Sequence, residues 1–118
     1  KVDLIVADLS FISLTLVLPA LVSVANTSAN YLVMVKPQFE VGREKLGAGG
    51  VVREPALRKS AVMEVADCAW DMGLGCRGVV ASSLPGPAGN VEYFLWLVRG
   101  ASTLPEVEVD EAIKIGPQ

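Results

Sequence analysis

Three ionisable residues stand where apolar segments of this sequence meet turns. Asp8 follows the apolar segment VDLIVA, Lys36 follows YLVMV, and Glu92 precedes the run YFLWLV. An amine can accept a proton only in its neutral form, which burial favours and neighbouring carboxylates oppose. If the two effects balance, Lys36 can take the proton of an alcohol while Asp8 and Glu92 orient it. The reaction class that needs only these groups is transfer to a hydroxyl.

The elements that must position these groups form a predicted α/β sheet with parallel strands. The pattern predicts buried strands over residues 2–8, 31–35 and 76–82, separated by helices over 14–25 and 56–72. The polar segment 26–30, NTSAN, is expected to be a break before the second strand. Pro37 ends that strand, because it has no N–H and restricts its predecessor to extended backbone. Right-handed crossovers then bring the carboxyl ends of these strands to one edge.

A fourth strand is predicted over residues 91–98. The segment LPGPAGN that precedes it is too short for a crossover, so the fourth strand should run antiparallel to the third. It then begins at the edge where the third strand ends, which places Glu92 near Asp8 and Lys36. In open α/β sheets this edge binds ligands, so the sequence predicts a catalytic cluster there.

Each of these residues also has a purely structural explanation. Asp8 could cap a helix or form an Asx-turn, and Lys36 could be a surface lysine at a strand end. Glu92 could be a solvated residue at the start of an edge strand. Their joint placement at one predicted edge favours function over these separate explanations.

Composition limits the other classes of site. The 118 residues form one domain at most, and their net charge of -3 argues against a surface for sequence-independent binding of phosphates. Arg43, Lys45 and Arg53, in the glycine-rich loop 38–53, are the local candidates for phosphate contacts, although each could also be a solvated loop charge. Cys68 and Cys76 form no CxxC pair and the chain has no histidine, so both are expected to be reduced core residues, without a metal site.

The apolar stretch 11–25 favours a buried helix over a membrane span. Four residues interrupt it, Ser13, Thr15, Pro19 and Ser23, and it is shorter than the run of about 20 that a span needs. No signal peptide opens the chain, so the expected compartment is the cytoplasm. Residues 100–118 form a polar tail to which no element is assigned.

Several linked segments resemble a known family. VADLSFISLTLVLPAL, VMVKPQFEVG, GGVVREPALR and SSLPGPAGNVEYFLWL closely resemble the carboxyl-terminal half of the TlyA family, hemolysin-A-type proteins related to FtsJ RNA methyltransferases. The resemblance covers roughly residues 2–99. It implies the second half of a Rossmann-like domain that transfers a methyl group from S-adenosylmethionine to the 2'-hydroxyl of cytidines in ribosomal RNA, in both ribosomal subunits.

The resemblance also implies roles for individual residues. The last three members of the family's Lys-Asp-Lys-Glu tetrad fall on Asp8, Lys36 and Glu92, with Lys36 as the general base. The stretch Asp8, Leu9, Ser10 and Phe11 would line the methyl-donor pocket, with Phe11 against the cofactor or, alternatively, in the core. The family's first tetrad lysine, its glycine-rich cofactor loop and its S4-type RNA-binding module would precede Lys1.

Residues 1–99 are therefore expected to form half of a catalytic domain. The isolated chain should be inactive and should self-associate through an apolar sheet edge. Two alternatives remain from the sequence. One is a membrane-active hemolysin, although the sequence predicts no stable association with a membrane. The other is a non-catalytic module that binds RNA or a partner through the loop 38–53.

Overall fold

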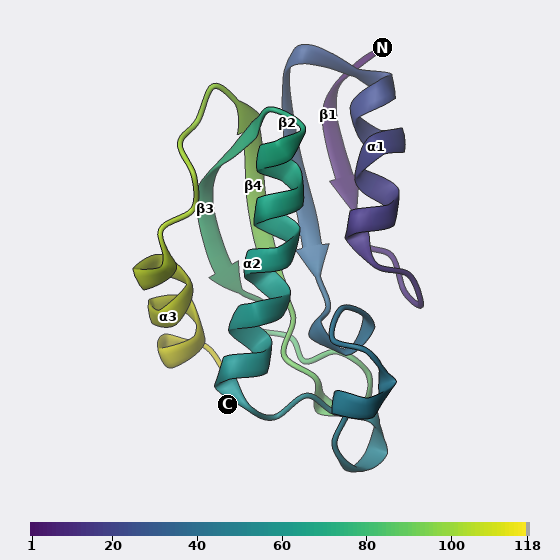
Figure 1. Ribbon diagram of the computed structural model, residues 1–118, viewed down its shortest axis with the longest axis vertical. Helices are drawn as coiled ribbons and strands as arrows, with labels where there is room; N and C mark the ends of the chain where they lie inside the picture. The colour runs from purple at the N-terminus through teal and green to yellow at the C-terminus, as the bar shows by residue number, and fades with distance from the viewer. Residues whose placement is uncertain (118) are drawn as a thin grey trace.

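The computed structural model describes residues 1–117, in which strands and helices alternate over the first two thirds of the chain (Figure 1). The main elements are β1 (Val2–Ala7), α1 (Leu14–Val24), β2 (Ala25–Val35), α2 (Pro55–Asp71), β3 (Leu74–Ala81), β4 (Tyr93–Arg99) and α3 (Glu106–Ile115). Short 3-10 turns lie in the connections: η1 (Pro37–Phe39), η2 (Arg43–Lys45), η3 (Ala48–Gly50) and η4 (Pro87–Gly89). The predicted α/β class is confirmed.

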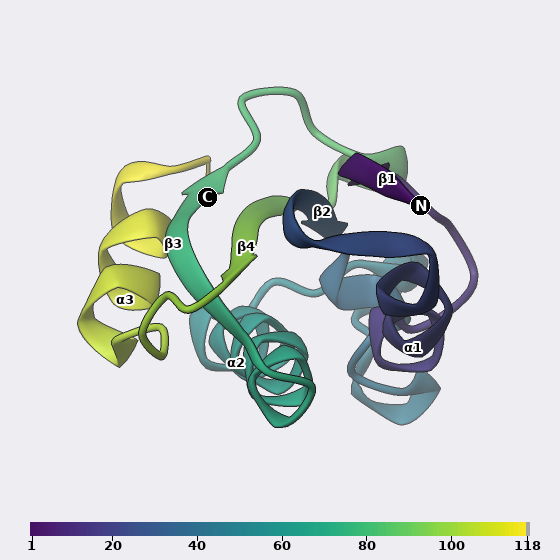
Figure 2. The same ribbon diagram turned by 90° about the horizontal axis from the view of Figure 1, so that it is seen from above.

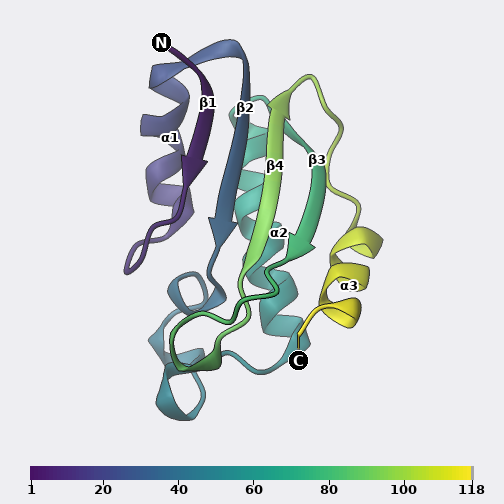
Figure 3. The same cartoon turned by 180° about the vertical axis from the view of Figure 1, so that it is seen from behind.

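The sheet has four strands in the order β1-β2-β4-β3 (Figure 3). β1 and β2 are parallel, while β4 runs antiparallel to both β2 and β3, as predicted for the last strand. The sequence did not predict that β4 inserts between β2 and β3. Because β1, β2 and β3 all point the same way, their carboxyl ends share one edge, and β4 begins there.

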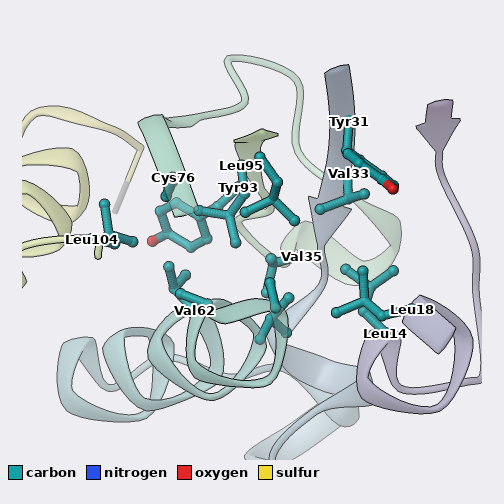
Figure 4. Packing of buried hydrophobic residues seen from close by; sticks show 14 of the residues in the cluster. Leu14, Leu18, Tyr31, Val33, Val35, Val62, Cys76, Tyr93, Leu95 and Leu104 are labelled. Carbon is teal, nitrogen blue, oxygen red and sulfur yellow. The ribbon is translucent and has the colours of Figure 1, made fainter. Parts of the chain in front are cut away.

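Helices α1 and α2 cover one face of this sheet, and α3 lies beside β3 (Figure 2). The hydrophobic core lies between these helices and the strands. Alternate residues of each strand face the helices, as the pleat of a strand requires. Figure 4 shows the packing, in which side chains of α1 and α2 meet those of β2 and β4; among them are Leu14, Leu18, Val33, Val35, Val62, Tyr93 and Leu95.

The opposite face of the sheet carries exposed apolar side chains. We call this set the open face; it comprises Val2, Leu4, Val6, Leu32, Val80 and Trp96. β1 is moreover an edge strand, paired only with β2 among the described residues. The exposed apolar side chains of the open face and the edge position of β1 together form the apolar sheet edge that the sequence predicted.

One local expectation was wrong. The segment 26–30 is not a break but part of β2, where Asn30 pairs with Leu4 on one side and Val98 on the other. Residues 26–29 lie within an irregularity of the β1–β2 register, and the pairs on either side of it, Val2 with Ala25 and Leu4 with Asn30, keep the segment in the strand.

The polar tail also has structure. Residues 106–115 form α3, which buries Val109, Ala112 and Ile113 against the rest of the domain. The sequence conceals this helix because its remaining residues are mostly charged and its apolar stripe is short. Gln118, the last residue of the tail, lies outside the described residues.

The two cysteines lie in or near the core. Cys76 is buried and Cys68 half-buried, and both are free thiols. Within residues 1–117 there is no cluster of side chains suited to hold a metal ion. None of the helices in this part of the chain has the length and apolarity to span a membrane.

Candidate active site

Lys36 lies at the carboxyl edge, directly after β2, and its side chain is only 9% exposed. Its Nζ is 2.5 Å from Oδ1 of Asp8 and donates a hydrogen bond to Oγ of Ser10 at 3.2 Å. The parallel register pairs Ala7 with Val33. Continued along both chains, it brings the segment after β1 alongside Lys36. Neighbouring strand ends therefore create the contact between Asp8 and Lys36, as the sequence predicted.

Glu92 lies across from Lys36 on the other side of β2. The antiparallel register pairs Val35 with Tyr93, and one further step places Lys36 opposite Glu92. Glu92 is 5% exposed and does not form an ion pair with Lys36. The structure thus brings Asp8 and Lys36 into contact, and it places Glu92 beside them without direct contact.

The Glu92 carboxylate packs closely against the turn before β4. A Cβ atom at Gly86 would lie 2.3 Å from Oε2 of Glu92, so only glycine leaves room for the carboxylate here. Asn90 joins this turn to the long loop: its Oδ1 accepts from Val52 N at 2.9 Å and its Nδ2 donates to Gly50 O at 3.0 Å. Asn90 is almost fully buried, so these bonds fix both segments around Glu92.

Two residues that hold this site in place, both in the segment 36–40, were not predicted from the sequence. Gln38 donates from Nε2 to Oε2 of Glu92 at 3.0 Å. Glu40 accepts from Ser13 Oγ at 2.5 Å and from Leu14 N at 2.9 Å, so it caps the first turn of α1. The alternation of polar residues at 36, 38 and 40 was the available signal.

Glu40 has a raised pKa. Burial is the main cause and the nearby Glu64 carboxylate adds to it, while the hydrogen bonds from Ser13 and Leu14 act in the opposite direction. The capping carboxylate is therefore held in a partly desolvated place between α1 and the turn after β2.

The stretch from Asp8 to Phe11 lies on the surface of this edge. Phe11 is 87% exposed, so the alternative that it is a core aromatic is wrong. Its φ of 64° falls in the left-handed region, which is unusual for a bulky residue, and its ring centroid lies 5.0 Å from that of Phe39. Leu9 is exposed as well. This apolar strip next to Lys36 suits contact with a partly apolar ligand.

The three basic loop residues are all exposed, but they do not form a purely basic surface. η2 carries Arg43 and Lys45, while Arg53 donates from Nη1 to Ala48 O at 3.2 Å. Lys45 and Arg53 border a shallow depression whose lining also includes Glu44 and Glu54. The local charge is therefore mixed.

Comparisons with known proteins identify the family of this chain. A family model described as FtsJ-like methyltransferase matches residues 1–99. The chain is 60% identical over 97 residues to the 16S/23S rRNA (cytidine-2'-O)-methyltransferase TlyA of Mycobacterium tuberculosis H37Rv, a match that covers 82% of this chain and 36% of that protein. It is 33% identical over 95 residues to Hemolysin A of Brachyspira hyodysenteriae, covering 77% and 38%.

A solved structure shares the fold. The crystal structure of a protein provisionally described as a hemolysin from Lactococcus lactis superposes with a TM-score of 0.88 at 32% identity, over 95% of this chain and 54% of that one. The chain spans between a third and two fifths of the length of the relatives named above. On the match over residues 1–99, the chain belongs to the FtsJ-like methyltransferase family, and its relatives place it in the TlyA group.

Proposed function

We propose that this chain supplies the catalytic edge of an enzyme that methylates the 2'-hydroxyl of cytidine in ribosomal RNA, with S-adenosylmethionine as methyl donor. The observation that carries the proposal is the buried Lys36 amine, paired with Asp8 at 2.5 Å and placed opposite Glu92. The name of the Mycobacterium tuberculosis relative, a cytidine-2'-O-methyltransferase, supports the substrate class.

In this proposal Lys36 takes the proton of the ribose hydroxyl as the oxygen attacks. The side chain is held on a buried stem, so its Nζ has a defined position at the edge of the sheet. Asp8 is 64% exposed on its side chain and gives the amine a route for proton exchange with solvent. Glu92 and Asp8 orient the amine and the hydroxyl from opposite sides of β2.

The methyl donor fits the exposed strip beside Lys36. Leu9 and Phe11 offer apolar surface, and Ser10 supplies a hydroxyl that already contacts Lys36. The left-handed backbone at Phe11 is energetically unfavourable, and such strained conformations occur often at ligand sites. When bound, S-adenosylmethionine would supply the methyl group: the ribose oxygen would gain the new C–O bond as the C–S bond breaks, and S-adenosylhomocysteine would leave.

The chain alone is proposed to be inactive. Residues 1–99 would be the carboxyl-terminal half of the catalytic domain, because the relatives are more than twice as long as the matched segment. A lone strip at one sheet edge encloses little of a cofactor, whereas ligand sites usually bury most of their ligand. Arg43, Lys45 and Arg53 remain candidates for contacts with RNA phosphates, as ribosomal RNA is the proposed partner.

The test is methyl transfer from labelled S-adenosylmethionine to ribosomal subunits by a full-length protein that carries this segment. Lys36→Ala should lower the rate by roughly 10²-fold or more, the usual effect of losing a general base. Lys59→Ala is the matched control, because Lys59 also forms an ion pair, with Asp110 at 3.0 Å, away from the site. Undiminished transfer by Lys36→Ala would overturn the assignment.

A further inference from the structure

The Glu92 carboxylate depends on one side chain for its direction. Its backbone is fixed by the hydrogen bond from Ser82 N to Glu92 O at 2.7 Å. The carboxylate is buried, yet it forms no ion pair with any residue of the described chain. Among residues 1–117, its side-chain hydrogen-bond partner is the Gln38 amide, which donates from Nε2 at 3.0 Å. Backbone pairing thus places Glu92, and the amide sets where its oxygens lie.

Gln38 sits on the same short turn as Lys36. The turn η1 begins at Pro37, and it is closed by the bond from Phe39 N to Lys36 O at 2.9 Å. Glu40 N bonds to Pro37 O at 3.0 Å in the next step. One rigid turn therefore carries both the Lys36 amine and the group that holds Glu92.

The orientation of the Gln38 amide follows from its charged neighbour. A flipped amide would set its carbonyl oxygen against the Glu92 carboxylate, and two acceptors repel each other. With the nitrogen toward Glu92, Oε1 is buried and has no hydrogen-bond partner among residues 1–117. A buried acceptor without a partner is unfavourable for folding, so stability alone does not explain a glutamine at this position.

We infer that Gln38 is a positioning residue for methyl transfer: its amide fixes the Glu92 carboxylate relative to Lys36. The amide is uncharged, so it holds Glu92 without neutralising it and without competing with Lys36 for the carboxylate. The catalytic meaning of this inference rests on the proposed function, whereas the contact between the amide and the carboxylate does not.

The experiment replaces Gln38 by methionine, which has a similar length and no amide. In the full-length protein, Gln38→Met should lower kcat by about 10- to 100-fold, as expected for losing a hydrogen bond to a charged group, with little change in KM for S-adenosylmethionine. In a Glu92→Gln background the same change should cost almost nothing more, because the two residues act as one unit.

Asn26→Leu is the matched control. Asn26 also donates an amide hydrogen bond to a carboxylate, that of Asp3 at 2.6 Å, but at the opposite end of β1 and β2. It should leave kcat unchanged. An equal loss of activity in Asn26→Leu, or an additive loss when Gln38→Met is combined with Glu92→Gln, would overturn the inference.

A second measurement separates this inference from the proposed function. In the 118-residue chain, the carboxyl carbon resonance of Glu92 should shift in Gln38→Met and stay in place in Asn26→Leu. An unmoved resonance in Gln38→Met overturns the contact itself. If the full-length native protein transfers no methyl group, the proposed function and the catalytic meaning of Gln38 fail together, while the resonance still decides the contact.

Discussion

Asp8 and Lys36 form an ion pair whose two members differ sharply in exposure, at 64% for the aspartate side chain and 9% for the lysine. The pair joins the ends of β1 and β2, and the amine end is the one enclosed by protein. Because one partner is open to water, the pair should contribute little to folding. The main effect of the ion pair is to hold the Lys36 amine in a defined position.

Asp8→Asn should therefore affect activity far more than stability. The asparagine keeps the size of the side chain but removes its charge, so Lys36 loses its orienting partner. We expect methyl transfer by the full-length protein to fall by about 10-fold or more, while the free energy of unfolding changes by about 1 kcal/mol or less. Asp110→Asn, which breaks the ion pair with Lys59, is the control and should leave transfer unchanged.

Gly86→Ala should displace the Glu92 carboxylate. The new Cβ would lie 2.3 Å from Oε2, and the end of the Glu92 side chain is the part that can move away. The loss of stability should thus stay below about 3 kcal/mol, whereas methyl transfer should fall strongly. Gly78→Ala is the control, because its Cβ would meet no atom within 4 Å. Full activity of Gly86→Ala would show that Glu92 has no fixed role.

The Glu40 carboxyl should make stability depend on pH. Burial raises its pKa above the ordinary value of 4.5. The folded protein then binds the proton more tightly than the unfolded chain does. The Glu40 carboxyl therefore contributes to the free energy of unfolding below pH 4.5, and this contribution is lost as the pH rises through the raised pKa of the folded state.

Relative to Glu40→Gln, the native chain should therefore lose stability as the pH rises above 4.5 and through the raised pKa of Glu40. Urea unfolding of both proteins at several pH values measures this difference. Glu44→Gln, an exposed residue of the same loop without these hydrogen bonds, is the control. A difference between native and Glu40→Gln that stays constant over this range contradicts the prediction.

The open face and the edge strand β1 should cause the isolated chain to self-associate. Val6 is 66% exposed and lies on both features. A lysine there places a charge on the edge, which opposes strand addition. Sedimentation should show a mass that increases with concentration for the native chain and not for Val6→Lys. Leu16→Lys, at an exposed apolar site on α1, should behave like the native chain. A native chain that remains monomeric would disprove self-association.

Much of the architecture can be predicted from local sequence because its causes are local. Pro37 ends β2 by its own geometry, and the short, β-branched apolar runs favour buried strands. The turn before Glu92 is too short for a crossover, which determines the antiparallel direction of β4. Asp8, Lys36 and Glu92 could therefore be placed at one edge before the structure was known.

Other features were decided by tertiary contacts. Residues 26–30 became strand because the β1–β2 pairs Val2–Ala25 and Leu4–Asn30 hold the segment at both ends, and α3 formed because its short apolar stripe packs beside β3. Gln38 bonds to Glu92, which lies 54 residues away just before β4. Glu40 bonds to Leu14, which lies 26 residues away at the start of α1. A hydrogen bond between distant segments leaves no periodicity in the sequence. Local residues thus determined the strands and their polar ends, and only the packing of distant segments decided which side chains hold the site together.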